Sequence, residues 1–257
     1  MIAFYLFLIS VLHMSVSHSL ILPPSSARMR AILFDIDGTL CDSTPLCFDA
    51  TNKILTHNGF QNIDISAYKA GSKYTTAKRF AWHAAGDPEA EIGNTLGEQF
   101  DNLYVDLVSQ DSVPLFPGIS SLVESIKKTD GSIKLGALTN ACGAYARAVQ
   151  SSHPVIKQCF EISLGVDDVP SPKPSGEGLL TCCKALGVEP SEAIYIGDAP
   201  TDGLAAFSAG SPFIYVQYLL KVYALLFHLL YVQACEVWGL LGAATRRHRW
   251  TADDLMS

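Results

Sequence analysis

The sequence contains no dense block of lysine and arginine, and only 17% of its 257 residues are charged. The formal net charge of −7 disfavours binding to nucleic acid through neutralisation of backbone phosphates. Because 49% of the residues are hydrophobic, the chain can build a sizeable core, and wholesale disorder is disfavoured. The length suits one large α/β domain, or a core domain that carries a smaller one.

The cysteines form neither a zinc-binding pattern nor a disulfide framework. There are seven of them, an odd number, and their spacings match neither kind of site. We therefore expect reduced and mostly buried thiols in a soluble, reducing compartment such as the cytoplasm or a plastid.

The first 22 residues are strongly apolar, but no lysine or arginine precedes their apolar centre. Residues 1–27 are therefore expected to be a leader that acts as a targeting segment. A membrane anchor is the alternative, since roughly 20 apolar residues can span a bilayer. The sequence does not choose between a plastid, the secretory route and another destination.

A second apolar stretch, at about 213–234, enters an atypical C-terminal tail at 217–257. Gln217, Lys221 and His228 make it a poor membrane helix, so membrane contact through either stretch is not favoured. One alternative is an amphipathic helix that packs on the core or on a partner. The other, which we favour, is an insertion or gene-model error at 217–235.

Short apolar runs alternate with helical patterns after Arg30. The runs are typical of strands buried on both faces, and the segments between them have the spacing and the end signals of helices. This alternation predicts a parallel, doubly wound α/β sheet. The strands are expected at 31–34, 133–138, 159–164, 193–196 and 212–216, and helices at 119–127 and 178–186.

One segment, from about Thr44 to Val113, shows helical periodicity and no convincing strand. It predicts a helical domain inserted after the first strand. One amphipathic face contains Phe48, Ile54 and Leu55, and another contains Leu96, Phe100, Leu103, Tyr104 and Leu107.

The strongest chemical signal is the hexapeptide Asp35-Ile36-Asp37-Gly38-Thr39-Leu40, directly after the first predicted strand. Ligands in open α/β sheets bind beyond the carboxyl ends of the strands. One carboxylate of the pair could attack phosphorus and form an aspartyl-phosphate, while the other handles the proton. A hard cation such as Mg²⁺ would relieve the repulsion between the carboxylate and a phosphate group.

Three further polar clusters each follow an apolar run. Thr139-Asn140 offers a hydroxyl and an amide for phosphate oxygens, and Lys173 can neutralise the phosphate and the nucleophile. Asp198 and Asp202 add carboxylates for the cation.

These four clusters, in this order, resemble the four motifs of haloacid dehalogenase (HAD) superfamily hydrolases, over roughly Arg30 to Val216. The resemblance implies that Asp35 is the nucleophile and Asp37 the general acid and base. It also implies that Thr139 and Lys173 hold the phosphoryl group.

By the same resemblance, Mg²⁺ would be bound by Asp35, the backbone carbonyl of Asp37 and Asp198, with Asp202 supporting. A HAD-like core would comprise residues 28–43 and 114–216, with a helical cap at 44–113. The position of the cap is similar to that in the branch that contains phosphoglycolate phosphatases.

Two residues separate reactions within the superfamily. Haloacid dehalogenases lack the second acidic residue, so Asp37 argues against dehalogenation. Sugar phosphomutases of this cap type place a histidine about where Cys47 lies. We therefore expect a phosphatase that hydrolyses a small-metabolite phosphate monoester, such as phosphoglycolate or a sugar phosphate. The alternatives are a sugar phosphomutase and a catalytically silent, membrane-tethered binding module.

Gly71, Lys73 and Arg79 lie about where family members place a substrate-specificity loop. Lys73 or Arg79 could meet a substrate carboxylate. The simpler expectation for both cations is a solvated place on the surface.

Overall fold

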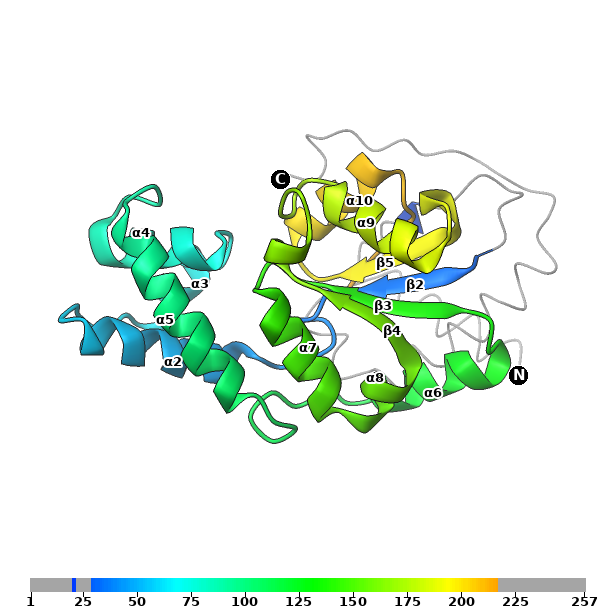
Figure 1. Ribbon diagram of the computed structural model, residues 1–257, viewed down its shortest axis with the longest axis horizontal. Helices are drawn as coiled ribbons and strands as arrows, with labels where there is room; N and C mark the ends of the chain where they lie inside the picture. The colour runs from blue at the N-terminus through cyan, green and yellow to red at the C-terminus, as the bar shows by residue number, and fades with distance from the viewer. Residues whose placement is uncertain (1–19, 22–28, 217–257) are drawn as a thin grey trace, which may run out of the picture.

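The computed structural model describes residues 20–21 and 29–216. Its centre is a six-stranded sheet with the order β1-β6-β5-β2-β3-β4 (Figure 1). Strands β2 to β6 run parallel, as predicted, and β1 pairs antiparallel with β6. The strands are β1 (Leu20–Ile21), β2 (Ala31–Phe34), β3 (Lys134–Leu138), β4 (Phe160–Leu164), β5 (Ala193–Gly197) and β6 (Phe213–Tyr215).

Strand β1 lies within the segment that was expected to be a leader. Leu20 pairs with Ile214 and Ile21 with Phe213, which adds a short strand to the edge of the sheet. The rest of the expected leader and the C-terminal tail lie outside the described residues. In the described ranges, no helix has the length and apolar character needed to cross a membrane.

Strand β2 shows why the apolar runs are continuous. Ala31 and Leu33 join a core cluster with helices α9 (Glu177–Leu186) and α10 (Pro200–Ala209). Ile32 and Phe34 join the cluster on the other face of the sheet. That cluster includes helices α6 (Ile119–Thr129), α7 (Gly143–Ser152) and α8 (Pro154–Cys159). Both faces of the strand are covered, so no alternation of polar residues is expected.

The predicted helical insert consists of four helices between β2 and β3, to the left of the sheet in Figure 1. They are α2 (Thr44–His57), α3 (Ile65–Gly71), α4 (Thr76–Ala85) and α5 (Ile92–Leu107). Leu96, Phe100 and Tyr104 are buried, whereas Leu107 at the end of α5 is 38% exposed. Helices α4 and α5 pack so closely that a Cβ at Gly93 would lie 2.3 Å from the Ala77 carbonyl oxygen.

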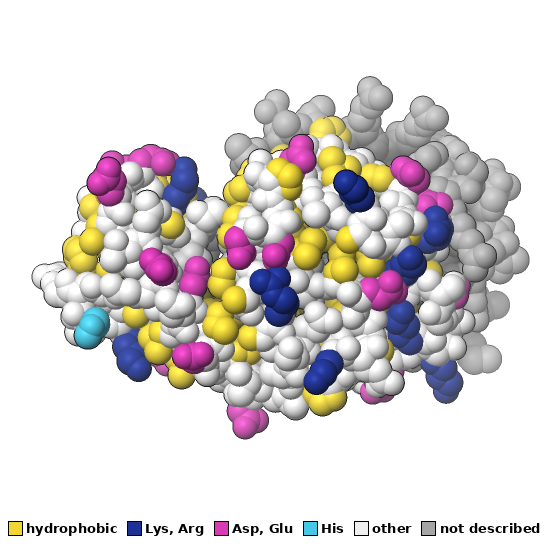
Figure 2. Space-filling view, in the orientation of Figure 1, with side chains coloured by type: hydrophobic (Ala, Val, Ile, Leu, Met, Phe, Trp, Pro, Cys, Tyr) yellow, Lys and Arg dark blue, Asp and Glu magenta, His cyan; other side chains and the backbone are white. Residues whose placement is uncertain are grey.

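The described surface agrees with the absence of a basic block. On the face shown in Figure 2, basic and acidic side chains are interspersed over the core helices and the insert.

Two short 3-10 helices, η1 (Val166–Asp168) and η2 (Pro190–Glu192), complete the described elements. Because β2, β3 and β5 are parallel, the loops that follow them meet at one edge of the sheet, where Asp35, Thr139 and Asp198 lie.

Candidate active site

The loop after β2 comes very close to the loop after β5. Gly38 has a φ of +83°, and a Cβ there would lie 2.3 Å from Asp198 Oδ2. The Thr39 hydroxyl donates a hydrogen bond to Asp198 Oδ1 at 3.1 Å. A side chain at position 38 would be strained and would also collide with Asp198, so this turn requires glycine.

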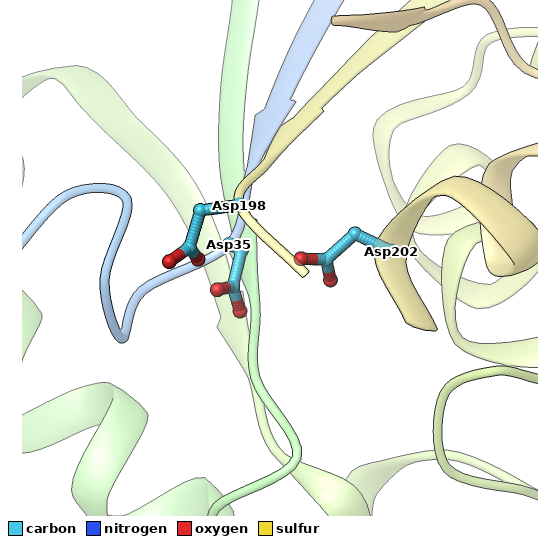
Figure 3. A group of neighbouring side chains, drawn as sticks. All are labelled: Asp35, Asp198 and Asp202. Atoms are coloured by element: carbon cyan, nitrogen blue, oxygen red, sulfur yellow. The ribbon is translucent and has the colours of Figure 1, made fainter. Parts of the chain in front are cut away.

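Three carboxyl groups gather at this edge of the sheet. One oxygen each of Asp35, Asp198 and Asp202 lies within 4.8 Å of the others. Figure 3 shows the carboxyl groups of Asp35 and Asp198 side by side, with that of Asp202 turned towards them from α10. Carboxylate oxygens are the ligands that a hard divalent cation prefers, so this set fits such an ion.

A buried lysine lies among these carboxyl groups. Lys173 Nζ is 2.6 Å from Asp35 Oδ1 and 2.7 Å from Asp202 Oδ1, and it donates to the Tyr195 hydroxyl at 3.0 Å. Both ion pairs are almost completely removed from solvent. A buried charge requires such partners, because an unpaired one would cost several kcal/mol of desolvation, on the order of 3–5 kcal/mol.

Asn140 fixes the loop that carries Lys173. Its side-chain oxygen accepts from the Lys173 backbone N–H, and its amide donates to the Lys173 carbonyl, both at 2.9 Å. The amide was expected to face phosphate oxygens, and in this structure it is used by the backbone instead. A contact between Asn140 and phosphate stays a prediction.

The electrostatics of the cluster favour a further positive charge. Burial raises the pKa of Asp35 well above its usual range; Asp202, Asp198 and Asp37 raise it further, and Lys173 opposes them. Burial alone would lower the pKa of Lys173, but Asp202 and Asp35 together raise it above its ordinary value. A divalent cation would stabilise the ionised form of Asp35, which a nucleophile needs.

Asp37 lies in a separate set of hydrogen bonds, all from hydroxyl groups. The hydroxyls of Ser43 and Tyr145 both donate to Asp37 Oδ1 at 2.7 Å. Thr139 Oγ1 donates to Asp37 Oδ2 at 2.7 Å and itself accepts from the Ala141 N–H. The Asp37 side chain is thus not one of the three carboxyl groups of the cluster, and three hydroxyl groups orient it.

The three residues predicted in the insert have different surroundings. Lys73 is exposed, as the simpler expectation had it. For Arg79 that expectation is wrong, because only 8% of its surface is accessible and its guanidinium packs over aromatic rings. Gly71 is buried, and a Cβ there would lie 2.8 Å from His83 Nε2. Close packing against His83 therefore explains why position 71 is a glycine.

Sequence reasoning missed Ser43, Tyr145 and Tyr195. Tyr195 lies inside an apolar strand, so the sequence predicts only that its ring belongs to the hydrophobic core. In the structure its hydroxyl donates to Asp202 Oδ1 at 3.0 Å. Ser43 follows Asp37 by six positions and reaches it locally, whereas Tyr145 reaches Asp37 from α7, 108 positions away. The one signal in the sequence was that a tyrosine expected to be buried usually needs a hydrogen-bond partner for its hydroxyl.

The family model of the haloacid dehalogenase-like hydrolases matches residues 29–210. The chain belongs to this family. The resemblance carried by the four motifs is thereby confirmed, and so is the expectation of a hydrolase. The matched range includes all four clusters and the whole helical insert.

Several members of the HAD-like family are similar along most of this chain. The phosphoglycolate phosphatase of Caulobacter vibrioides is 30% identical over 194 residues, 73% of this chain and 78% of that protein. The N-acetylmuramic acid 6-phosphate phosphatase of Pseudomonas putida is 28% identical over 200 residues, 74% of this chain and 84% of that protein. The structure of CbbY from Rhodobacter sphaeroides in complex with phosphate superposes with a TM-score of 0.61. It is 27% identical and covers 71% of this chain and 84% of its own.

Proposed function

We propose that this protein is a Mg²⁺-dependent phosphatase that hydrolyses a phosphate monoester of a small metabolite. The observation that carries the proposal is the buried Lys173, which pairs with Asp35 at 2.6 Å and with Asp202 at 2.7 Å, beside Asp198. Three carboxylates and one ammonium at the carboxyl ends of parallel strands suit a nucleophile, a cation and an anionic substrate.

The proposed reaction has two steps. In the first, an oxygen of Asp35 bonds to phosphorus, the bond from phosphorus to the ester oxygen breaks, and Asp37 gives its proton to that oxygen. An alcohol leaves, and Asp35 carries the phosphoryl group. In the second step, a water oxygen bonds to phosphorus, the bond from phosphorus to the Asp35 oxygen breaks, and a proton of the water passes to Asp37; inorganic phosphate leaves and Asp35 is regenerated.

The other residues bind and orient the substrate in this proposal. Lys173 and Thr139 would contact the phosphoryl oxygens, so that negative charge developing there meets a fixed ammonium and a hydroxyl. Asp35, Asp198 and the Asp37 carbonyl would hold Mg²⁺, with Asp202 supporting. The cation supplies neutralisation of the charge on the nucleophile and on the phosphate.

The insert at 44–113 would act as a cap over the core segments 28–43 and 114–216. Its closure would exclude bulk water during the first step. We propose that Gly71, Lys73 and Arg79 belong to the part of the cap that selects the substrate. Phosphoglycolate and sugar phosphates are the leading candidates, because the relatives named for phosphoglycolate and for a sugar phosphate are similar to comparable extents.

The test is release of inorganic phosphate from a panel of phosphoglycolate, sugar phosphates and p-nitrophenyl phosphate. It is run with Mg²⁺, with EDTA, and with Asp35→Asn. A matched control is Asp111→Asn, which makes the same change at an exposed aspartate outside the site. We expect Mg²⁺-dependent release that EDTA and Asp35→Asn abolish and Asp111→Asn preserves.

No release by a folded wild-type protein would overturn the phosphatase proposal. Transfer of the phosphoryl group within a sugar phosphate, without release, would indicate a sugar phosphomutase instead. If the protein neither releases nor transfers phosphate, a catalytically silent binding module is favoured.

A further inference from the structure

Tyr145 contacts the proposed proton donor from inside the protein. It lies in α7, its side chain is fully buried, and its hydroxyl donates to Asp37 Oδ1 at 2.7 Å. Burial raises the pKa of this hydroxyl, and the charge of Asp37 raises it further. The hydrogen bond and the complete burial make the phenol a fixed donor to Asp37.

The ring of Tyr145 is held by the helical insert. Tyr104 of α5 stacks on it, with the ring centroids 4.8 Å apart and the planes at 24°. Phe100 stacks on Tyr104 at 4.8 Å, and Phe80 of α4 lies 5.3 Å from Phe100. A column of four rings thus extends from α4 through α5 to α7, and it ends at the hydroxyl that contacts Asp37.

The two oxygens of Asp37 have different surroundings. Oδ1 accepts from Tyr145 and Ser43, whereas Oδ2 accepts from Thr139. In the proposed reaction Thr139 turns to the phosphoryl group, which frees Oδ2 to carry the proton. Oδ1 keeps its two donors, so the carboxyl group stays in one orientation while Oδ2 gives up the proton.

We propose that Tyr145 is a positioning residue that orients Asp37 for proton transfer, with its ring fixed by Tyr104 of the insert. The inference rests on the proposed phosphatase function and adds a residue that no motif contains. Stiff aromatic rings suit this role, because each has only two side-chain torsions and both rings are almost completely buried.

The decisive readout is the dependence on the leaving group. The leaving group of an alkyl ester such as phosphoglycolate is an alkoxide, which needs a proton. The leaving group of p-nitrophenyl phosphate is p-nitrophenolate, which leaves without one. Tyr145→Phe keeps the ring and removes only the hydroxyl. We expect it to lower kcat/KM, which reports the first step without the hydrolysis of the intermediate, by about tenfold or more for the alkyl ester and by less than about threefold for p-nitrophenyl phosphate.

Two comparisons sharpen this test. Tyr215→Phe is the matched control, since Tyr215 in β6 makes no side-chain hydrogen bond with another described residue. It should leave both activities unchanged. Tyr104→Leu removes the stacking ring and should reduce the alkyl-ester activity selectively. Tyr104→Phe, which keeps the ring, should lose less than Tyr104→Leu.

Equal losses of kcat/KM on the two substrates in Tyr145→Phe would show a merely structural role and overturn the proposal, as would no loss at all. If the wild-type protein hydrolyses neither substrate, the proposed function has failed, and crystal structures decide the positioning role separately. We expect the Asp37 carboxyl group to rotate or to become disordered in Tyr145→Phe. An unchanged Asp37 would overturn the inference.

Discussion

Among the described residues, the core and the helical insert each bury one cation, and they stabilise it in different ways. Lys173 in the core pairs with the carboxylates of Asp35 and Asp202. Arg79 in the insert has no carboxylate within ion-pair distance among the described residues, and its Nε and Nη2 atoms have no hydrogen-bond partner there. Its Nη1 contacts Cys47 Sγ at 3.4 Å, and three rings surround it.

The difference in how the two cations are stabilised indicates what each region can bind. Aromatic faces attract a guanidinium by about 0.5–2 kcal/mol, which offsets part of its desolvation but gives no hydrogen-bond partner to Nε and Nη2 of Arg79. Carboxylates at 2.6–2.7 Å neutralise an ammonium fully and hold it in place. The core therefore presents an organised ionic site, whereas the insert presents a cation with unused hydrogen-bonding capacity, which suits a part that meets a substrate group.

The largest effect is expected from Lys173→Met. The change leaves Asp35 and Asp202 buried without their cation, so we expect a loss of about 3–5 kcal/mol in the free energy of unfolding. Phosphatase activity should also be lost. Urea denaturation measures the first effect, and phosphate release from the folded fraction measures the second. A stable and active Lys173→Met protein would refute the role given to this ion pair.

Removal of the cation comes next. If Mg²⁺ binds the three carboxylates of the native state only, a concentration about 100 times Kd should stabilise the fold by about 2.7 kcal/mol. Thermal unfolding with EDTA and with Mg²⁺ gives the comparison. Asp198→Asn should abolish the shift, and Asp111→Asn should keep it. A shift of equal size in Asp198→Asn would place the ion elsewhere.

Arg79→Met should have a smaller and opposite effect on stability. Replacing an incompletely paired buried charge by an apolar side chain of similar length is neutral or stabilising, here by about 1 kcal/mol. Lys73→Met, on the surface, should change the free energy of unfolding by less than about 0.5 kcal/mol. Loss of more than about 2 kcal/mol in Arg79→Met would mean that its contacts with the rings and Cys47 outweigh its desolvation.

The smallest effect is a pH dependence beside Arg79. Burial lowers the pKa of His83 to about 4, and the charge of Arg79 contributes in the same direction. The unfolded chain then binds more protons than the folded one as the pH falls from His83's ordinary pKa towards 4, so stability falls across that window. His83→Gln should lose less stability there in urea denaturation. Parallel pH profiles for the two proteins would contradict this assignment.

The fold could be predicted from the sequence because its signals are local. The run Ala31–Phe34 became β2 with the expected bounds, and the helix expected at 178–186 ends at Leu186, where Gly187 follows with a φ of +64°. Asp35, Thr139 and Asp198 lie at one edge of the sheet because each directly follows a parallel strand, and Lys173 reaches Asp35 from the longer segment after β4. Parallel strands bring their carboxyl ends to one edge without further information.

The parts that could not be predicted depend on single contacts between distant segments. Tyr145 reaches Asp37 across 108 positions of sequence, from a helix whose apolar face gives no hint of a hydroxyl contact. Arg79 is buried because aromatic side chains from α3, α4 and α5 converge on it, whereas an isolated arginine is usually exposed. The edge strand β1 is too short for any periodicity.

In the proposed mechanism, Asp35 becomes phosphorylated during turnover. The most direct measurement is acid quenching of the protein with its best substrate and Mg²⁺ on the millisecond scale, followed by mass spectrometry of the peptides. We expect a phosphoryl group on the peptide that contains Asp35, absent in Asp35→Asn and after EDTA. An active protein without phosphoryl label on Asp35, or a labelled and active Asp35→Asn protein, would contradict the mechanism.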